Sequence, residues 1–152
     1  MDKRLVRLGY GLLIPASLIF GIKALLLVFA AGDRIPGFAF AIAGILSGLG
    51  MVALLFGFVK SPHFTQAAVA MLVAFTGHWI VARFVSEDLG GAMVYLGTGF
   101  AASIRTPWAA SMGVMAGLGA ILRSQPQLGP LPQILIAIGA LGTAAALYRN
   151  LD

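Results

Sequence analysis

Four polar side chains lie inside otherwise apolar stretches, and these are the residues with which the chain could do chemistry. They are Lys23, Thr76, His78 and Thr143. A lysine inside a bilayer is costly, so it is a candidate for binding a carboxylate or handling a proton. Lys23 stands well inside its stretch, eight residues before Ala31, but a lysine snorkels part of that distance, and snorkelling of its ammonium group towards the headgroups is the simpler interpretation.

His78 is the side chain closest to metal or haem chemistry. A metal or haem site needs further ligands. The other histidine, His63, falls in a predicted loop on the opposite membrane face, and the chain has no cysteine. We therefore expect no metal and no bound cofactor, and we interpret His78 as a hydrogen-bonding residue of a helix bundle.

The acidic residues show no catalytic arrangement. Glu87 and Asp88 are the only adjacent acids, and they stand where one apolar stretch ends and the next begins. Carboxylates in that position stabilise the positive end of the following helix dipole. The chain has no Gly-x-Ser-x-Gly, Walker or His-Glu-x-x-His sequence. We expect no enzymatic activity.

Glycine spacing is the sharpest local pattern. The pattern Gly-x-x-x-Gly-x-Gly occurs twice, formed by Gly44, Gly48, Gly50, Gly113, Gly117 and Gly119. Small residues let helix backbones approach closely in lipid, where no hydrophobic force draws helices together. We predict a helix-packing interface at each stretch. Packing within the chain is the simpler form, and contact with another subunit or sliding between transporter repeats is the functional one.

The elements that must position these residues are apolar helices. Of 152 residues, 60% are hydrophobic and only 10% are charged, with a mean hydropathy of +0.98. Soluble domains carry about 25% charged residues. These values predict an all-α, polytopic transmembrane bundle in a single domain, 1–152. The basic residues that give the net charge of +5 stand singly at the ends of apolar stretches, which indicates membrane topology rather than nucleic-acid binding.

Three stretches, 8–31, 38–59 and 66–85, have the ~20 residues needed to cross about 30 Å of hydrocarbon. A last span is expected over 131–148. Residues 89–122 form either two short helices, 89–104 and 107–122, or one span near 100–122 after an interfacial segment. An arginine at the bilayer centre costs roughly 2.5–3.5 kcal/mol or more, so Arg105 favours a surface turn between two helices. We therefore prefer six short spans, with four or five as the alternative.

A weak internal repeat agrees with six spans. The glycines of the first stretch return after roughly 70 residues, and Arg34-x-Pro36 returns as Arg105-x-Pro107. A copied unit of three helices enters the membrane from the opposite side, so halves 1–86 and 87–152 would be inverted repeats. Chance matching in a chain rich in glycine and alanine is the other explanation.

Charge placement predicts the orientation. With a cytoplasmic N-terminus, the inner side receives Lys3, Arg4, Arg7, Lys60, Arg105 and Arg149. The outer side receives Arg34, Arg83 and Arg123. This agrees with the positive-inside tendency and predicts a multi-pass protein of a bacterial inner membrane. Aromatic residues near the span ends are predicted interface anchors: Tyr10, Tyr95, Trp108 and Tyr148.

Two hypotheses for function follow, and no family resemblance selects between them. Small size and few intramembrane polar groups favour an accessory or assembly subunit of a larger membrane complex, which binds other membrane subunits or a second copy through its glycine-lined faces. The alternative is a small transporter or channel made of inverted three-helix repeats, with a site near Lys23, Thr76, His78 and Thr143. Its weakness is the small number of polar groups for lining a path. The expected partners are the bilayer and other membrane proteins, without nucleic acid.

Overall fold

The computed structural model describes residues 1–29 and 35–152, and within these residues the chain is all-helical, with six helices and no strand. The first half contains α1 (Lys3–Val28), α2 (Gly37–Gly57) and α3 (Phe64–Thr76), which runs on through the π-helical segment η1 (Gly77–Val81) into α4 (Ala82–Phe84). The second half contains α5 (Glu87–Ala102), α6 (Ala109–Leu122), the short 3₁₀ turn η2 (Pro126–Leu128) and α7 (Leu131–Arg149).

Local sequence explains where several helices begin. The Asp2 carboxylate accepts hydrogen bonds from the backbone N–H groups of Arg4 and Leu5, which caps α1. Ser86 caps α5 through the N–H of Leu89, and Glu87 and Asp88 occupy the first turn, as the sequence predicts. Such side chains satisfy amide groups that have no partner within the helix.

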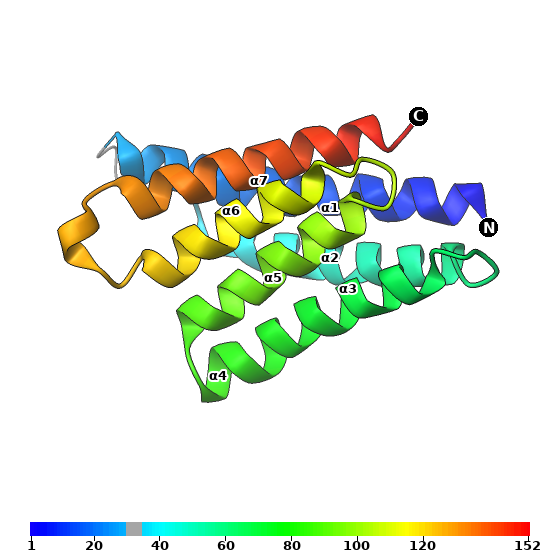
Figure 1. Ribbon diagram of the computed structural model, residues 1–152, viewed down its shortest axis with the longest axis horizontal. Coiled ribbons are helices and arrows are strands. Elements are labelled where there is room, and N and C mark those ends of the chain that lie inside the picture. Colours follow the sequence, from blue (N-terminus) through cyan, green and yellow to red (C-terminus); the bar gives the residue numbers. More distant parts are fainter. Residues whose placement is uncertain (30–34) are drawn as a thin grey trace.

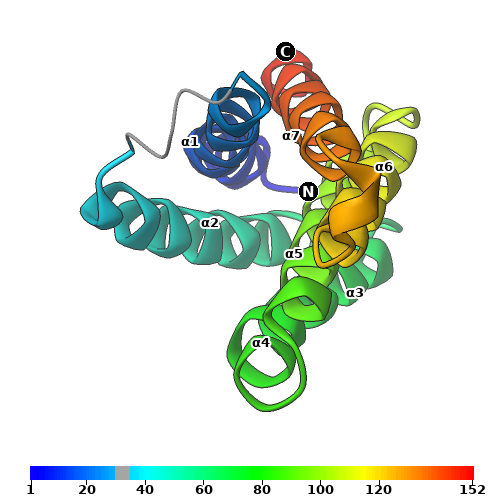
Figure 2. The ribbon, with the colours of Figure 1, turned by 90° about the vertical axis from the view of Figure 1, so that its left-hand side faces the viewer.

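Successive helices run in opposite directions, so the two termini lie at the same end of the molecule (Figure 1). We call this the terminal end. It also holds the α2–α3 turn and the α5–α6 turn, and the opposite end is the far end. Each helix packs beside the next in the order α2, α1, α7, α6, α5 and α3. Helices α2 and α3 touch over only a short length (Figure 2).

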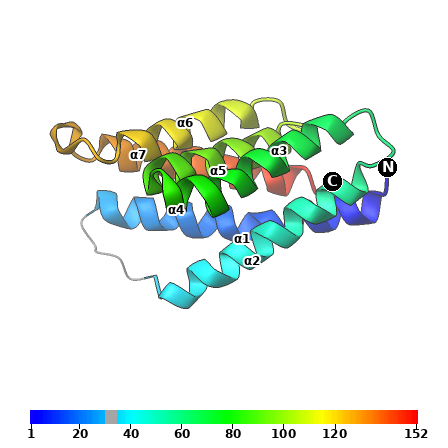
Figure 3. The ribbon, with the colours of Figure 1, turned by 90° about the horizontal axis from the view of Figure 1, so that it is seen from below.

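The hydrophobic core is broader at the terminal end. There, one cluster takes buried side chains from all six helices, including Tyr10, Leu54 and Leu147. Towards the far end, a smaller cluster built around Ala24 and Ile136 takes side chains from α1, α5, α6 and α7 only. The first residues of α2 diverge from the other helices in this direction (Figure 3).

Four of the six helices are long and apolar enough to cross a membrane: Lys3–Val28, Gly37–Gly57, Phe64–Phe84 and Leu131–Arg149. Residues 89–122 form two helices joined by a turn at Arg105, as expected. At 1.5 Å per residue, α5 and α6 are only about 24 and 21 Å long. The structure thus supports six helices and four helices of spanning length, and the expectation of six membrane spans stays a prediction.

Buried hydrogen bonds fasten the terminal end. The Asn150 side chain donates to the carbonyl of Ala102, and its oxygen accepts from the Thr106 hydroxyl. Arg105 donates to the carbonyl of Asn150, and the Tyr10 hydroxyl donates to the carbonyl of Ala101. These bonds join α1, the α5–α6 turn and the C-terminal residues. The prediction that Tyr10 is an interface anchor was therefore wrong, because its ring is fully buried in the core.

The two predicted repeat halves pack differently. In the second half, α6 packs along both α5 and α7, whereas in the first half α2 packs along α1 and barely contacts α3. Pro36 precedes α2, and Pro107 stands in the turn before α6, but Arg34 lies outside the described residues. The inverted repeat stays a prediction from the sequence.

Candidate functional site

The glycines of α6 lie against neighbouring helices of the same chain. A β-carbon added at Gly119 would lie 2.5 Å from the carbonyl oxygen of Pro132 in α7. At Gly113 it would lie 2.9 Å from the carbonyl oxygen of Tyr95 in α5, and at Gly117 it would lie 3.3 Å from the Leu96 side chain. These glycines therefore allow α5, α6 and α7 to approach closely.

The matching glycines of α2 have different surroundings. Only Gly50 is enclosed, because an added β-carbon would lie 2.9 Å from the carbonyl oxygen of Gly9 in α1. At Gly44 no atom of another described element lies within 4 Å, and at Gly48 the nearest is the ring of Phe75, 3.9 Å away. Exposed apolar side chains flank them, including Ile45 and Leu49. The structure thus leaves one side of the α2 glycine stretch uncovered by the described chain.

Three of the four predicted polar residues do not line a common cavity. The Lys23 ammonium lies 4.7 Å from the centre of the Phe40 ring, which joins α1 to the first turn of α2 by a cation–π contact. His78 is exposed on the π-helical segment, where its ring packs edge-on against Trp79. Thr76 is half-buried at the end of α3.

Thr143 lies in a small cavity that sequence reasoning missed. The cavity has a volume of about 20 Å³, and hydroxyl-bearing residues of α1, α2, α5 and α7 line it: Ser17, Ser47, Tyr95, Thr98 and Thr143. The two threonines donate their hydroxyls to the carbonyls of Val94 and Gly139, four residues earlier in their own helices. Their oxygen lone pairs remain able to accept hydrogen bonds inside the bundle.

No periodic pattern marks this cavity in the sequence. Ser17, Ser47 and Thr98 stand singly among small and apolar residues, as many lipid-facing or packed hydroxyls do. Their convergence depends on how each helix is rotated about its axis. Two aromatic contacts close the side towards the far end: the Phe20 ring packs against Phe40 at 5.9 Å and against Tyr95 at 5.7 Å.

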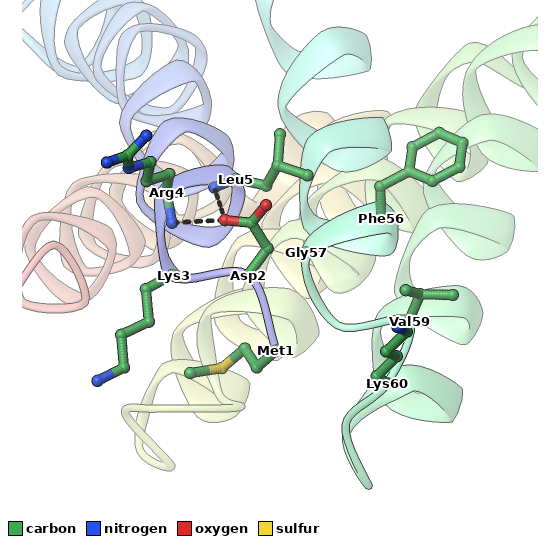
Figure 4. Close-up of a pocket in the computed structure, with 9 residues that line it drawn as sticks. All are labelled: Met1, Asp2, Lys3, Arg4, Leu5, Phe56, Gly57, Val59 and Lys60. Carbon is green, nitrogen blue, oxygen red and sulfur yellow. Dashed lines mark hydrogen bonds between the residues drawn. The ribbon is translucent and has the colours of Figure 1, made fainter.

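A second hollow opens at the terminal end, between the start of α1 and the end of α2 (Figure 4). It has a volume of about 720 Å³, and the backbone N–H of Asp2 donates to the carbonyl of Gly57 beside it, 2.8 Å away. Basic and apolar side chains line it together: Lys3, Arg4 and Lys60 with Met1, Leu5, Phe56 and Val59. Sequence reasoning treated these basic residues only as topology signals.

The described residues contain no group of three or more His, Asp or Glu side chains that could hold a metal ion. The hydroxyl groups of the cavity can supply hydrogen bonds, and the basic side chains of the hollow can recognise negative charge. No family model, no curated protein and no solved structure matches the chain.

Proposed function

We propose that the protein is an accessory or assembly subunit of a larger membrane complex, and that the uncovered glycine face of α2 receives a helix of a partner protein. The observation that carries this proposal is the difference between Gly44, which no other described element approaches within 4 Å, and Gly113, which α5 covers. The two glycines occupy the same position in the same glycine pattern.

Physical chemistry explains why such a face favours a helix over lipid. Helix association in a bilayer gains from van der Waals packing, and glycine permits a close backbone contact that flexible acyl chains cannot match. Isolated glycine in a helix carries a cost of about 1 kcal/mol relative to alanine in water. On α6 that cost is offset by close packing within the chain. On α2 the equivalent packing is supplied by the partner.

We further propose that the terminal end faces the cytoplasm. It carries the residues Lys3, Arg4, Arg7, Lys60, Arg105 and Arg149. At the far end, Arg123 is paired with Asp88 at 2.6 Å, and Glu87 is nearby in the chain. The positive-inside tendency supports this orientation. The location in a bacterial inner membrane remains a prediction from the sequence.

The test is the native mass of the complex extracted from its own membrane. Gly44→Leu with Gly48→Leu fills the α2 face, and Gly91→Leu is the matched control, because Gly91 in α5 also has no atom of another described element within 4 Å. We expect the α2 variant to lose the partner and the control to retain it. A wild-type protein that is extracted only as a monomer contradicts the proposal.

A second candidate function, a small transporter, is favoured by the hydroxyl-lined cavity around Thr143. A cavity of about 20 Å³ is large enough for one water molecule, which needs roughly 10–15 Å³. Liposome flux assays that compare the wild type with Thr143→Val and Thr98→Val, two residues that line the cavity, test this candidate. Flux of a small polar solute that both substitutions abolish would support it, and no flux in the wild type would exclude it.

A further inference from the structure

We propose that the hollow between α1 and α2 at the terminal end binds an anionic phospholipid, with the phosphate held by Lys3 and Lys60. This inference rests on the proposed membrane location and is independent of the partner proposed for α2. It concerns the side chains of Figure 4.

The first argument is charge. Lys3, Arg4 and Lys60 line the hollow with one acid, Asp2. The Asp2 carboxylate is engaged by α1, where one of its oxygens accepts hydrogen bonds from the N–H groups of Arg4 at 3.0 Å and Leu5 at 3.3 Å. The lining therefore keeps a positive balance that suits a phosphate group.

The second argument is the combination of charge with apolar surface. Lys60, Phe56 and Val59 stand on the α2 side of the hollow, and Lys3 stands on the other side with its side chain extended away from them (Figure 4). Both lysines are exposed, so a phosphate bound in the hollow can draw the two flexible side chains towards it. Both Phe56 and Val59 are more than half exposed. A free phosphate ion gains nothing from contact with this apolar surface, whereas the upper acyl carbons of a lipid bury apolar area against it.

The third argument is size and position. The volume of about 720 Å³ is within the range of ligand sites, roughly 300–1,000 Å³. The hollow lies where α1 begins and α2 ends, so headgroup atoms reach the lysines while the acyl chains stay beside the helices. Basic pockets between membrane helices on the cytoplasmic side bind lipid headgroups in the same way.

The experiment is native mass spectrometry of the full chain in detergent, titrated with phosphatidylglycerol or phosphatidylcholine. We expect the wild type to retain phosphatidylglycerol preferentially, and the variant Lys3→Gln with Lys60→Gln to bind it on the order of tenfold more weakly, since each basic residue near a membrane surface contributes severalfold. The matched control is Arg149→Gln, an exposed cation of the same end that does not line the hollow. It should change binding less than about twofold.

Two further measurements distinguish a lipid site from a site for free phosphate. Phe56→Ser should weaken phosphatidylglycerol binding severalfold, because it removes the apolar wall. Inorganic phosphate at millimolar concentration should not displace the lipid. Equal loss in the lysine variant and in Arg149→Gln would overturn the proposal in favour of general surface charge. Displacement by inorganic phosphate would overturn it in favour of a free-anion site. None of these variants alters Gly44 or Gly48, so the outcome is independent of the partner test.

Discussion

Helices α2 and α6 carry the same glycine spacing, but only α6 has all of its glycines enclosed by the chain. Gly113 and Gly117 face α5, and Gly119 faces α7. In α2, Gly50 faces α1, whereas Gly44 and Gly48 face no close neighbour among the described elements. A glycine pattern therefore predicts that a helix can pack closely against a neighbour, but it does not indicate which helix that neighbour is.

The cause of the difference lies at the two ends of the molecule. At the terminal end α2 contributes Met51, Leu54 and Phe58 to the main core. Towards the far end no described residue of α2 belongs to the second core, and the Phe20–Phe40 and Lys23–Phe40 pairs join α2 to α1 there. The main core thus holds α2 at the terminal end, and we propose that a partner helix packs on its uncovered part towards the far end.

The largest expected effect is at Gly119, the most enclosed glycine of the two glycine stretches. In Gly119→Ala the new methyl group would lie 2.5 Å from the Pro132 carbonyl oxygen and 2.9 Å from the Ile136 backbone nitrogen. Backbone atoms cannot rotate away, so α6 and α7 must separate. We expect the free energy of unfolding in detergent to fall by about 3 kcal/mol. An unchanged value would show that the α6 glycines are not a packing interface.

The second effect concerns the turn that leads into α6. Asn150→Ala removes two hydrogen bonds and leaves the Thr106 hydroxyl and the Ala102 carbonyl without their partner in a buried site. We expect a loss of about 2 kcal/mol in the free energy of unfolding. Gln127→Ala, on an exposed loop, is the control and should change stability by less than about 0.5 kcal/mol. Similar values for the two variants would contradict the idea that these bonds fasten α6.

A smaller effect is expected where a side chain, rather than backbone, is the nearest neighbour. In Gly117→Ala the new methyl group would lie 3.3 Å from the Leu96 Cγ and 3.4 Å from the Ala92 carbonyl oxygen. The leucine can shift by a few tenths of an ångström, so we expect a loss of only about 1 kcal/mol. Unfolding titrations of Gly117→Ala and Gly119→Ala measured together compare the two losses in free energy of unfolding. A larger loss for Gly117→Ala than for Gly119→Ala would contradict this prediction.

No loss of stability is expected at Gly44, where the same substitution meets open space. Gly44→Ala should raise the free energy of unfolding of the isolated protein by up to about 1 kcal/mol, because alanine is the better helix former. The measurement is the same titration on the purified chain. A loss as large as at Gly117 would mean that the first part of α2 is packed against the chain.

Much of the fold follows from the residues themselves. Hydropathy predicts the four long helices, and Arg105 beside Pro107 predicts the turn between α5 and α6. The basic residues assigned to one side of the membrane, from Lys3 to Arg149, do lie at one end of the bundle. The sequence also predicts that Glu87 and Asp88 open a helix, because acids favour the positive end of the helix dipole.

The rest depends on helix rotation, which a single chain with almost uniformly apolar helices does not specify. Tyr10 has the same sequence signal as an interface anchor, yet it is in the core. Ser17, Ser47 and Thr98 meet Thr143 only because four helices present one face each to the same point. The sequence also gives no signal for the π-helical turn at Gly77. In the structure Gly77 lies against Gly90 of α5.

Crosslinking from α2 in the native membrane tests most directly whether a partner covers its open face. A photoreactive side chain replaces Ile45, which is 63% exposed beside Gly44, and in a second protein replaces Leu118, which is 50% exposed on α6. We predict a discrete protein adduct from position 45, lost when Gly44 and Gly48 are changed to leucine, and lipid adducts alone from position 118. Lipid adducts alone from both positions would contradict the account.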